Sequence, residues 1–244
     1  MNMTVDVLAI GAHPDDIELA CGGTVALLVK QGYKVALADA TQGELGTRGS
    51  KEIRSKEADE AANILGVITR RNLRLADGQI DVSERNIKKL IVLIRELQPR
   101  LLLIPHSTER HPDHVHTHQL CKEAWFYSGL SKIHSKHAGI PQRPFRPDIF
   151  FEFMQWYHFE PSFVVDVSDT FDTKMRAIRA HSSQFHNPKS KEPETKLSTP
   201  EFLERVETEA RFYGHRIGAE YGEAFFCYAP VGVGNLFHIL THKK

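Results

Sequence analysis

Short apolar runs that alternate with amphipathic segments constrain the fold of this chain more than any other feature. The runs are VDVLAI (5–10), KVALADAT (34–41) and RLLLIP (100–105). They are rich in aliphatic residues, which is typical of strands buried on both faces. The segments 22–33, 50–66 and 83–99 have the apolar spacing of helices. This alternation predicts an α/β, Rossmann-like fold with a mostly parallel sheet flanked by helices on both faces.

The second half of the chain is less regular, but it continues the same mixture of elements. We expect strands near 72–73, at 149–156 and at 162–168, helices at 170–185 and 200–215, and polar connections at 131–148 and 187–199. No shift in composition marks a boundary, so we expect a single domain over residues 1–244.

The overall composition excludes several classes of protein. The formal net charge of zero argues against a nucleic-acid-binding surface, which needs a basic face. No stretch approaches the about 20 apolar residues of a membrane span, and the N-terminus reads as a strand and not as a signal peptide. Cys21, Cys121 and Cys227 are far apart and form no CxxC pair, so disulfides are not expected and a cytoplasmic location fits best.

Polar residues gather in the loops that follow the predicted strands. These loops are 11–21, 41–49 and 105–114. Ligands of parallel sheets bind beyond the carboxyl ends of the strands. The functional site is therefore expected where these loops meet.

Two of the loops carry a histidine beside carboxylates, HPDD after the first strand and HPDH after a later one. Imidazole and carboxylate groups suit a divalent metal, and a catalytic zinc site uses three protein ligands and leaves one position open for water. We predict His13, Asp16 and His114 as the ligands. His118 is four residues beyond His114 and is held as a reserve ligand.

Asp15 lies directly beside a predicted ligand, and adjacent carboxylates in a tight loop cannot easily face the same ion. A metal lowers the pKa of its bound water to about 7, so Asp15 is predicted to be the general base that takes the proton of this water. The alternative is that Asp15 only caps the helix that follows.

His111 and Asp113 belong to the second loop. We predict that His111, beside an acid, stays protonated and stabilises an oxyanion or donates to a leaving amine, with Asp113 orienting it. In the alternative role, Asp113 supports a metal-binding histidine.

Together these residues predict a metal-dependent amide hydrolase. Two histidines and a carboxylate also describe a non-haem Fe(II) oxygenase, but such a site leaves Asp15 and His111 unexplained. A non-enzymatic nucleotide- or metal-binding module on the same sheet is disfavoured because no GxGxxG follows the first strand.

The quoted loops resemble those of a known family. AHPDD, TQGELGTRG and ERHPDH, continued by AHSSQF (180–185) and GAEYGEAF (218–225), resemble the zinc-dependent N-acetylglucosaminide deacetylases of the PIG-L/LmbE-like family. The resemblance implies a Rossmann-like fold, a small-molecule substrate and zinc, with iron as a second metal that such ligands accept. It also implies the ligand and base roles given above. We expect a homo-oligomer as well.

Within this family, the stretches RSKEA (54–58) and ERHPDH resemble the bacillithiol-biosynthesis subgroup, which removes acetate from N-acetylglucosaminyl L-malate. The resemblance implies that Arg54 and Arg110 meet the malate carboxylates and that Glu44 lies near sugar hydroxyls. Precursors of mycothiol type and chitooligosaccharides are alternative substrates. One departure concerns Phe202, which stands where some relatives are expected to place a tyrosine over the metal.

Overall fold

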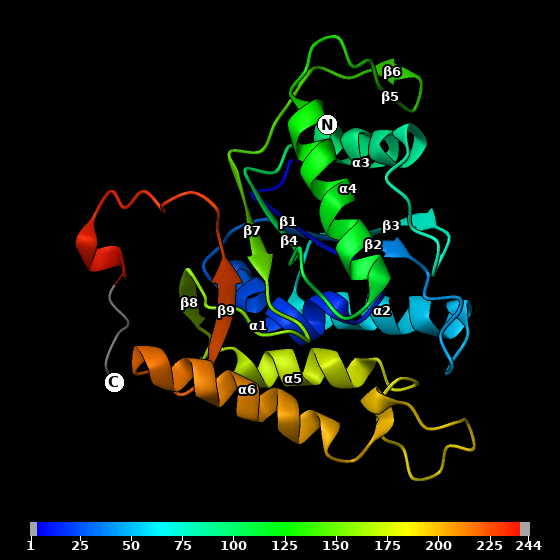
Figure 1. Cartoon of the computed structure of the whole chain (residues 1–244), viewed down its shortest axis with the longest axis vertical. Coiled ribbons are helices and arrows are strands. Elements are labelled where there is room, and N and C mark those ends of the chain that lie inside the picture. Colours follow the sequence, from blue (N-terminus) through cyan, green and yellow to red (C-terminus); the bar gives the residue numbers. More distant parts are fainter. Residues whose placement is uncertain (1–3, 240–244) are drawn as a thin grey trace.

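The computed structural model describes residues 4–239, so residues 1–3 and 240–244 of the predicted domain lie outside the described residues. The described residues form a seven-stranded sheet in the order β3-β2-β1-β4-β7-β9-β8 (Figure 1). Its strands are β1 (Val7–Gly11), β2 (Val35–Thr41), β3 (Thr69–Leu75), β4 (Leu101–Pro105), β7 (Ile149–Phe153), β8 (Phe163–Asp166) and β9 (Gly222–Phe226). Strands β3 to β7 in this order are parallel, and only β9 runs against its neighbours. The prediction of a mostly parallel sheet is confirmed.

Helices cover both faces of the sheet, as predicted. They are α1 (Asp16–Lys30), α2 (Lys51–Leu65), α3 (Glu84–Leu97), α4 (Pro112–Ser128), α5 (Phe171–Ala180) and α6 (Phe202–Ile217). Helices α3 and α4 pack on one face, whereas α1, α2 and α5 pack on the other. Helix α6 packs against β8, β9 and α5 (Figure 1). The connection between α4 and β7 contains a small hairpin, β5 (Lys136–His137) and β6 (Ile140–Pro141). The short helix η1 (Lys196–Ser198) precedes α6, and a second one, η2 (Leu236–Ile239), follows β9.

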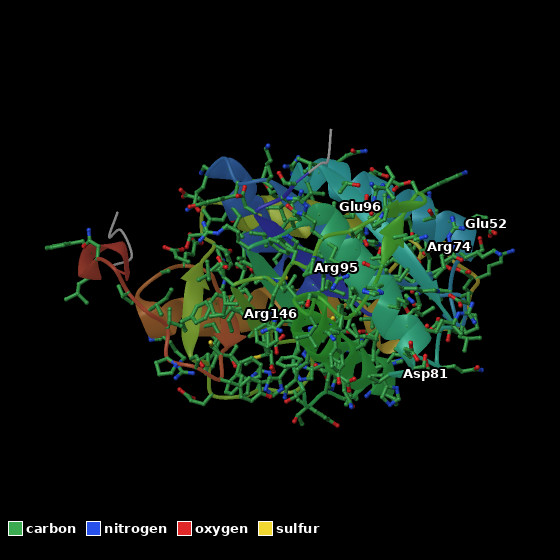
Figure 2. The ribbon with its side chains drawn as sticks, turned by 90° about the horizontal axis from the view of Figure 1, so that it is seen from above. Glu52, Arg74, Asp81, Arg95, Glu96 and Arg146 are labelled. Atoms are coloured by element: carbon green, nitrogen blue, oxygen red, sulfur yellow. The ribbon has the colours of Figure 1, made fainter. Side chains whose placement is uncertain are left out.

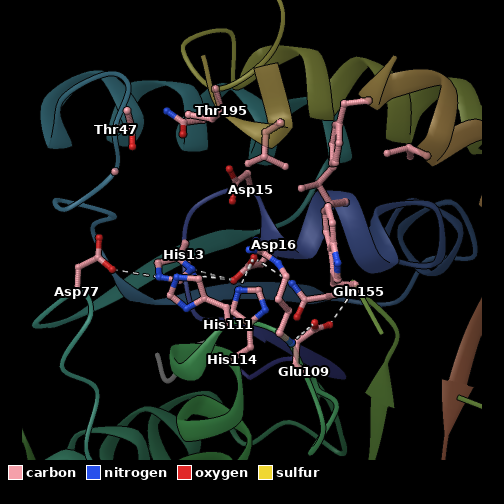
Figure 3. A pocket seen from close by; sticks show the side chains of 18 of the residues that line it. His13, Asp15, Asp16, Thr47, Asp77, Glu109, His111, His114, Gln155 and Thr195 are labelled. Carbon is pink, nitrogen blue, oxygen red and sulfur yellow. Dashed lines mark hydrogen bonds and ion pairs between the residues drawn. The ribbon is translucent and has the colours of Figure 1, made fainter. Parts of the chain in front are cut away.

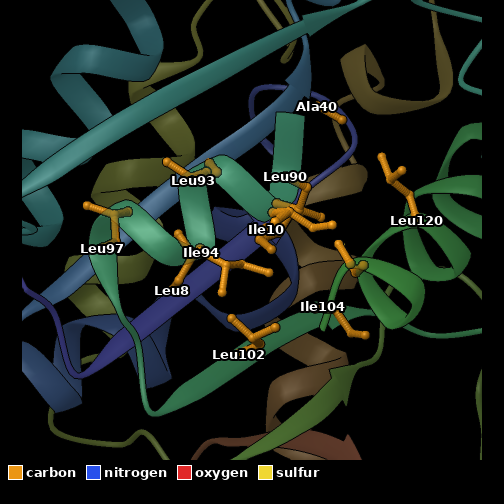
Figure 4. Close-up of a cluster of buried hydrophobic side chains, with 14 of the residues drawn as sticks. Leu8, Ile10, Ala40, Leu90, Leu93, Ile94, Leu97, Leu102, Ile104 and Leu120 are labelled. Carbon is orange, nitrogen blue, oxygen red and sulfur yellow. The ribbon is translucent and has the colours of Figure 1, made fainter. Parts of the chain in front are cut away.

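The central strands are apolar throughout because both of their faces are buried. Leu8 and Ile10 of β1 pack against Leu90 and Ile94 of α3 (Figure 4), while Val7 and Ala9, which alternate with them, belong to the cluster on the α1 face. Side chains alternate across a strand, so a run such as VDVLAI can supply two hydrophobic layers at once. This is why the first runs were recognisable from sequence.

Two elements differ from the sequence prediction. Helix α1 begins at Asp16 and not at residue 22, because the loop after β1 closes within a few residues; its backbone departs from helical angles at Cys21. Strand β9 was not predicted, since GEAFF is short and begins with glycine. It pairs antiparallel with both β7 and β8 and so joins β8 to the sheet.

Gly23 lies inside α1, where the sequence suggested the start of the helix. A Cβ atom at Gly23 would lie 2.9 Å from Cβ of Val167 and 3.0 Å from Oε1 of Glu223. The backbone N–H of Gly23 donates to the same Glu223 oxygen at 2.9 Å. Glycine is therefore needed for close packing of α1, not for a turn.

Two further sequence predictions can be compared with the fold. All three cysteines are free, as expected. Among residues 4–239, no helix is long and apolar enough to cross a membrane. The segment after β9 lies apart from the sheet and its helices in Figures 1 and 2, and Leu236 and Phe237 at its end are exposed.

A buried ion-pair network ties α1 to the edge of the sheet. Nε and Nη2 of Arg70 on β3 each donate at 2.8 Å to the carboxylate of Asp39 on β2, and Nη1 donates to Glu18 of α1. Burial alone would raise the pKa of Glu18, but Arg70 and His181 lower it to about 2. Arg70 and His181 therefore hold Glu18 as a buried anion, and the same guanidinium pairs with Asp39, whose pKa burial nevertheless raises.

Replacing this guanidinium should destabilise the fold strongly. We expect Arg70→Met to lower the free energy of unfolding by about 3 kcal/mol or more, because it leaves two buried carboxylates unpaired. Urea unfolding followed by circular dichroism measures the change. Arg71→Met is the matched control, since Arg71 is the next residue on β3 but its side chain is 45% exposed and makes only a surface pair with Glu96. The control should lose less than about 1 kcal/mol, and equal losses in both variants would contradict the role of Arg70.

Candidate active site

The candidate site lies where the chain reverses its direction across the sheet. From β1 the chain moves outward to β2 and β3, and it then returns to place β4 on the other side of β1. Loops that leave β1 and β4 diverge at such a point and open a crevice. A cavity of about 430 Å³ occupies this position. Of the predicted site residues, it is lined by His13, Asp15, Asp16, Arg54, Arg110, His111 and His114.

Asp16 joins the two loops. Its Oδ2 accepts the backbone N–H groups of Ala12 and His13 at 2.9 and 2.8 Å, which closes the turn between β1 and α1. Its Oδ1 lies 3.2 Å from Nε2 of His114 and accepts a hydrogen bond from Gln155 at 3.0 Å (Figure 3). One carboxylate thus shapes its own loop and contacts residues that follow β4 and β7.

The imidazole of His13 is surrounded by carboxylates. Its Nε2 lies 3.1 Å from Asp77 and 3.3 Å from Asp113, so the ring proton on Nε2 is donated to these acids (Figure 3). Its Nδ1 faces Asp16 at 3.6 Å. Burial lowers the pKa of His13, but the three acids outweigh burial and raise the pKa well above its usual value. The position favours a positive charge.

The histidine cluster fits a divalent metal ion. One donor atom each from His13, His111 and His114 lies within 4.8 Å of the others, and the same holds for His13, Asp77 and Asp113. Nδ1 of His114 is buried and has no hydrogen-bond partner among the described residues. Metal ligands of zinc sites lie about 3 to 3.5 Å from one another, as expected for bonds of about 2 Å in tetrahedral geometry. The predicted set His13, Asp16 and His114 is not one of these two groups. Nδ1 of His13 lies 3.6 Å from Oδ2 of Asp16, whereas Nε2 of His114 lies 3.2 Å from the other oxygen, Oδ1.

Asp15 has an unusual backbone and an unusual acidity. Its φ angle is 118°, in a region that residues other than glycine rarely adopt. Its side chain makes no capping hydrogen bond to α1. The alternative that Asp15 only caps the helix is therefore wrong. Burial raises the pKa of its carboxyl from 3.8 to about 6, although the Arg54 guanidinium at 3.4 Å lowers it. Asp15 can take and return a proton near neutral pH.

The predicted pairing of His111 with Asp113 needs correction. The carboxylate of Asp113 contacts His13, as in the alternative role, whereas the backbone N–H of Asp113 donates to Nδ1 of His111 at 3.2 Å. His111 thereby caps α4 with its own side chain. Burial, followed by the nearby His13 and His114, lowers the pKa of His111. The lowered pKa disfavours the protonated ring of the prediction, and a ring that carries its proton on Nε2 fits the contact of Nδ1 with the backbone N–H.

Arg54 supports the loops around Asp15. Its Nη2 donates to the carbonyl of Pro14 at 2.7 Å and its Nη1 to the carbonyl of Gly43 at 3.0 Å. A Cβ at Gly43 would lie 1.8 Å from this guanidinium, and φ at Gly43 is +66°. The glycine of TQGELG is needed because the arginine occupies the space of a side chain. Arg54 is at the cavity, but most of its donors are already used.

The remaining predicted residues occupy different places. Glu44 is exposed and is not among the cavity-lining residues; its Oε1 accepts the backbone N–H of Asp77 at 3.0 Å. His118 is not a reserve ligand, because its Nδ1 donates to the carbonyl of Pro105 outside the cavity. Phe202 does line the cavity, and none of the described residues lining it is a tyrosine.

Sequence reasoning missed several residues of the cavity. Asp77 follows β3, while Gln155 and Trp156 follow β7. All three stand just beyond the carboxyl ends of parallel strands, which is the signal that identified the first two loops. Applied to the strand expected near 72–73, the same rule would have found Asp77, whereas it identifies Gln155 and Trp156 only once β7 is known to lie parallel beside β4.

Comparison with known proteins agrees with this geometry. The family model described as PIG-L: GlcNAc-PI de-N-acetylase matches residues 8–125. Diacetylchitobiose deacetylase of Thermococcus kodakarensis is 31% identical over 229 residues, which cover 89% of this chain and 80% of that protein. The chain belongs to the PIG-L family. The enzymes of this family include deacetylases, and the predicted resemblance is confirmed at the level of the family.

Two further similar proteins extend the comparison. The probable N-acetyl-alpha-D-glucosaminyl L-malate deacetylase 2 of Bacillus cereus is 28% identical over 195 residues, covering 73% of this chain and 83% of that protein. The crystal structure of a conserved protein from Thermus thermophilus superposes with a TM-score of 0.84 at 34% identity, covering 94% of this chain and 97% of that one. Nearly the whole length of this chain therefore follows the fold of its relatives.

The raised pKa of Asp15 predicts a pH-dependent loss of stability in the metal-free protein. The pKa of Asp15 is about 6 in the folded state against 3.8 for an ordinary aspartate. Below pH 3.8 Asp15 is neutral in both states and does not lower the free energy of unfolding. As the pH rises to 6, the unfolded state loses this proton more readily, and the folded state loses stability. The full penalty is about 3 kcal/mol. The Asp15→Asn variant has no carboxyl at this position and therefore lacks this penalty. We therefore expect the stability of this variant relative to wild type to increase by about 2 kcal/mol between pH 4.5 and 7.5.

Urea unfolding of chelator-treated protein at the two pH values measures this difference. Asp148→Asn is the control, because the side chain of Asp148 is 64% exposed. A stability difference for Asp15→Asn that does not change with pH would contradict the raised pKa.

Proposed function

We propose that this protein is a zinc-dependent hydrolase that removes acetate from an N-acetylglucosaminyl conjugate, with N-acetylglucosaminyl L-malate as the favoured substrate. The observation that carries the proposal is the place of Asp15. It is a buried carboxyl with a pKa of about 6 that lines the same cavity as the histidine cluster. The membership of the PIG-L family supports the reaction class.

We assign the metal to His13, Asp16 and His114. The contacts of Nε2 of His13 with Asp77 and Asp113 leave Nδ1 for the ion, and such carboxylate partners are typical of metal-binding histidines. Backbone N–H groups of Leu45 and Gly78 hold these two acids, which therefore act as supports. A bound zinc ion would polarise the acetyl carbonyl and make a water molecule acidic. Iron suits the same donors.

Asp15 performs the proton transfer in this proposal. Its carboxylate accepts a proton from the attacking water as the new C–O bond forms at the acetyl carbon. The protonated carboxyl then gives this proton to the amide nitrogen as the C–N bond breaks, so that acetate and the free amine leave. A pKa near 6 suits both transfers. Arg54 fixes the loop that presents this carboxyl.

His111 supplies a hydrogen bond to the oxyanion. With Nδ1 occupied by the backbone N–H of Asp113, the free Nε2–H is the donor. A neutral imidazole stabilises negative charge that develops on the carbonyl oxygen. This role does not need the tyrosine that Phe202 replaces, and it is compatible with the lowered pKa of His111.

The identity of the conjugate rests on fewer observations. The cavity of about 430 Å³ is large enough for a sugar and a substituent. The relative from Bacillus cereus is named for a malate conjugate and that from Thermococcus kodakarensis for diacetylchitobiose. We favour the malate conjugate because arginines line the cavity, with Arg110 exposed and free to meet a carboxylate. Glu44 does not contact the substrate in this proposal; its carboxylate accepts the backbone N–H of Asp77 and so supports the loop that carries Asp77.

The proposed reaction predicts metal-dependent release of acetate. Purified protein with zinc should release acetate from N-acetylglucosaminyl L-malate, and a chelator should stop the release. Asp15→Asn should lower kcat about 100-fold or more, because the base and acid are lost. An acetate assay with both proteins measures this.

Asp148→Asn serves as the control and should retain wild-type kcat, since Asp148 lies in a surface ion pair with Arg100. Chelator-resistant release, or normal turnover by Asp15→Asn, would refute the mechanism.

The support of His13 gives a separate prediction for the metal. Asp113→Asn keeps an oxygen for the N–H of Gly78 but removes the negative charge beside His13. Loss of such a support lowers metal affinity about 10- to 100-fold. Zinc competition with a fluorescent chelator measures the affinity, with Asp148→Asn again as control. An unchanged affinity would show that the ion lies elsewhere.

A further inference from the structure

Three cationic side chains surround the indole ring of Trp156 at the edge of the cavity. The guanidinium carbons of Arg205 and Arg110 lie 4.0 and 4.6 Å from the ring centroid, and Nζ of Lys196 lies 5.1 Å from it. The three cations come from separate parts of the chain, namely α6, the loop between β4 and α4, and η1. A ring face attracts cations, so Trp156 holds all three in place.

The positive charges of this cluster are poorly balanced by acids. Among the ion pairs of residues 4–239, the three cations take part only in one, in which Arg205 lies 3.9 Å from Glu209. Glu209 in turn contacts Nε2 of His158. Like charges brought to one ring repel each other, and this repulsion is relieved when an anion binds between them.

The nearest acid in the loop is already engaged. Glu109 accepts the backbone N–H of Trp156 at 2.6 Å through Oε2 and the backbone N–H of Arg110 through Oε1. Its carboxylate therefore clamps the backbone of the two residues that face each other. In Figure 3, Glu109 and Thr195, which precedes Lys196, lie on opposite sides of the cavity. The cluster thus draws on residues from both sides of the cavity and gathers them at one ring.

The rim is directly connected to the reacting groups. Arg110 precedes His111 in the chain, and Trp156 follows Gln155, whose side chain donates to Asp16. Trp156, Arg110 and Arg205 line the same cavity as Asp15. An anion bound at the rim would therefore belong to the same molecule whose amide lies at Asp15.

We propose that Trp156, Arg110, Lys196 and Arg205 form an anion subsite that selects substrates with a carboxylate or a phosphate on the group attached to the sugar. Arg205 and Lys196 determine the specificity, and Trp156 is a positioning residue that orients the cations. The proposal rests on the proposed deacetylation for the identity of the reaction, and it makes the substrate class anionic. In this proposal the cations around Trp156 at the edge of the cavity, and not Arg54, bind the anion.

The test compares three substrates that differ in this group: N-acetylglucosaminyl L-malate, N-acetylglucosamine 1-phosphate and the neutral N,N′-diacetylchitobiose. Arg205→Gln and Lys196→Gln should each raise KM for the substrate with the fitting anion about fivefold or more, while kcat changes less than about twofold. KM for the neutral substrate should not change. The anionic substrate whose KM rises more in these variants shows whether the subsite prefers a carboxylate or a phosphate.

Two further variants control for indirect effects. Arg211→Gln removes a charge from the same helix at a surface ion pair with Glu207, and it should leave KM for every substrate unchanged. Trp156→Leu keeps all three cations but removes the ring, and it should reduce the preference for the anionic substrate without a matching loss of kcat. Added salt should raise KM for the anionic substrate of the wild-type protein only.

Calorimetric titration with the product, glucosaminyl L-malate, separates this proposal from the proposed reaction because it needs no turnover. Binding that weakens in Arg205→Gln and Lys196→Gln, but not in Arg211→Gln, supports the subsite even if no acetate is released. The subsite is refuted if both variants keep the wild-type KM and affinity for anionic ligands. It is also refuted if they lose the neutral substrate to the same extent.

Discussion

The carboxylate of Asp16 is the contact on which the site depends. Its Oδ2 closes the loop after β1 by accepting two backbone N–H groups, and its Oδ1 meets His114 from the loop after β4. Adjacent parallel strands bring the two loops to one edge of the sheet, but the sheet alone does not fix their side chains. Asp16 contacts both loops, and the neighbouring Asp15, whose φ is 118°, lines the cavity.

Charged side chains surround this contact, and further buried ion pairs lie behind it in the core. His13 stands among three acids: Asp77 and Asp113 accept backbone N–H groups of neighbouring loops, and Asp16 accepts those of its own loop. Behind α1, the guanidinium of Arg70 balances Glu18 and Asp39. Buried charges are tolerated only when they are paired, so the acidic site requires an equally ordered set of cations. Arg54 has this function for the loop of Asp15.

The sequence predicted those parts of the molecule in which one local pattern determines the structure. Aliphatic runs gave the central strands, and the HPDD and HPDH loops gave the residues that meet at the cavity. The direction of a side chain is not a local property, so Asp113 was expected to face His111 although it faces His13. Gln155 and Trp156 were missed because their role appears only once β7 is known to lie beside β4. Strand β9 depends on pairing with partners about 60 residues or more away.

The guanidinium that fills the space beside Gly43 has a consequence for how this loop can change. An alanine at Gly43 would collide with Arg54, and a shorter residue at position 54 would leave a void and would remove the side-chain donor of the Pro14 carbonyl, while the Gly43 carbonyl would keep only the backbone N–H of Gly46. Neither exchange is tolerable on its own, and because φ at Gly43 is +66°, a side chain at this position is strained even beside a shorter residue at position 54. The arginine thus restricts the choice of residue at a position eleven residues earlier in the chain.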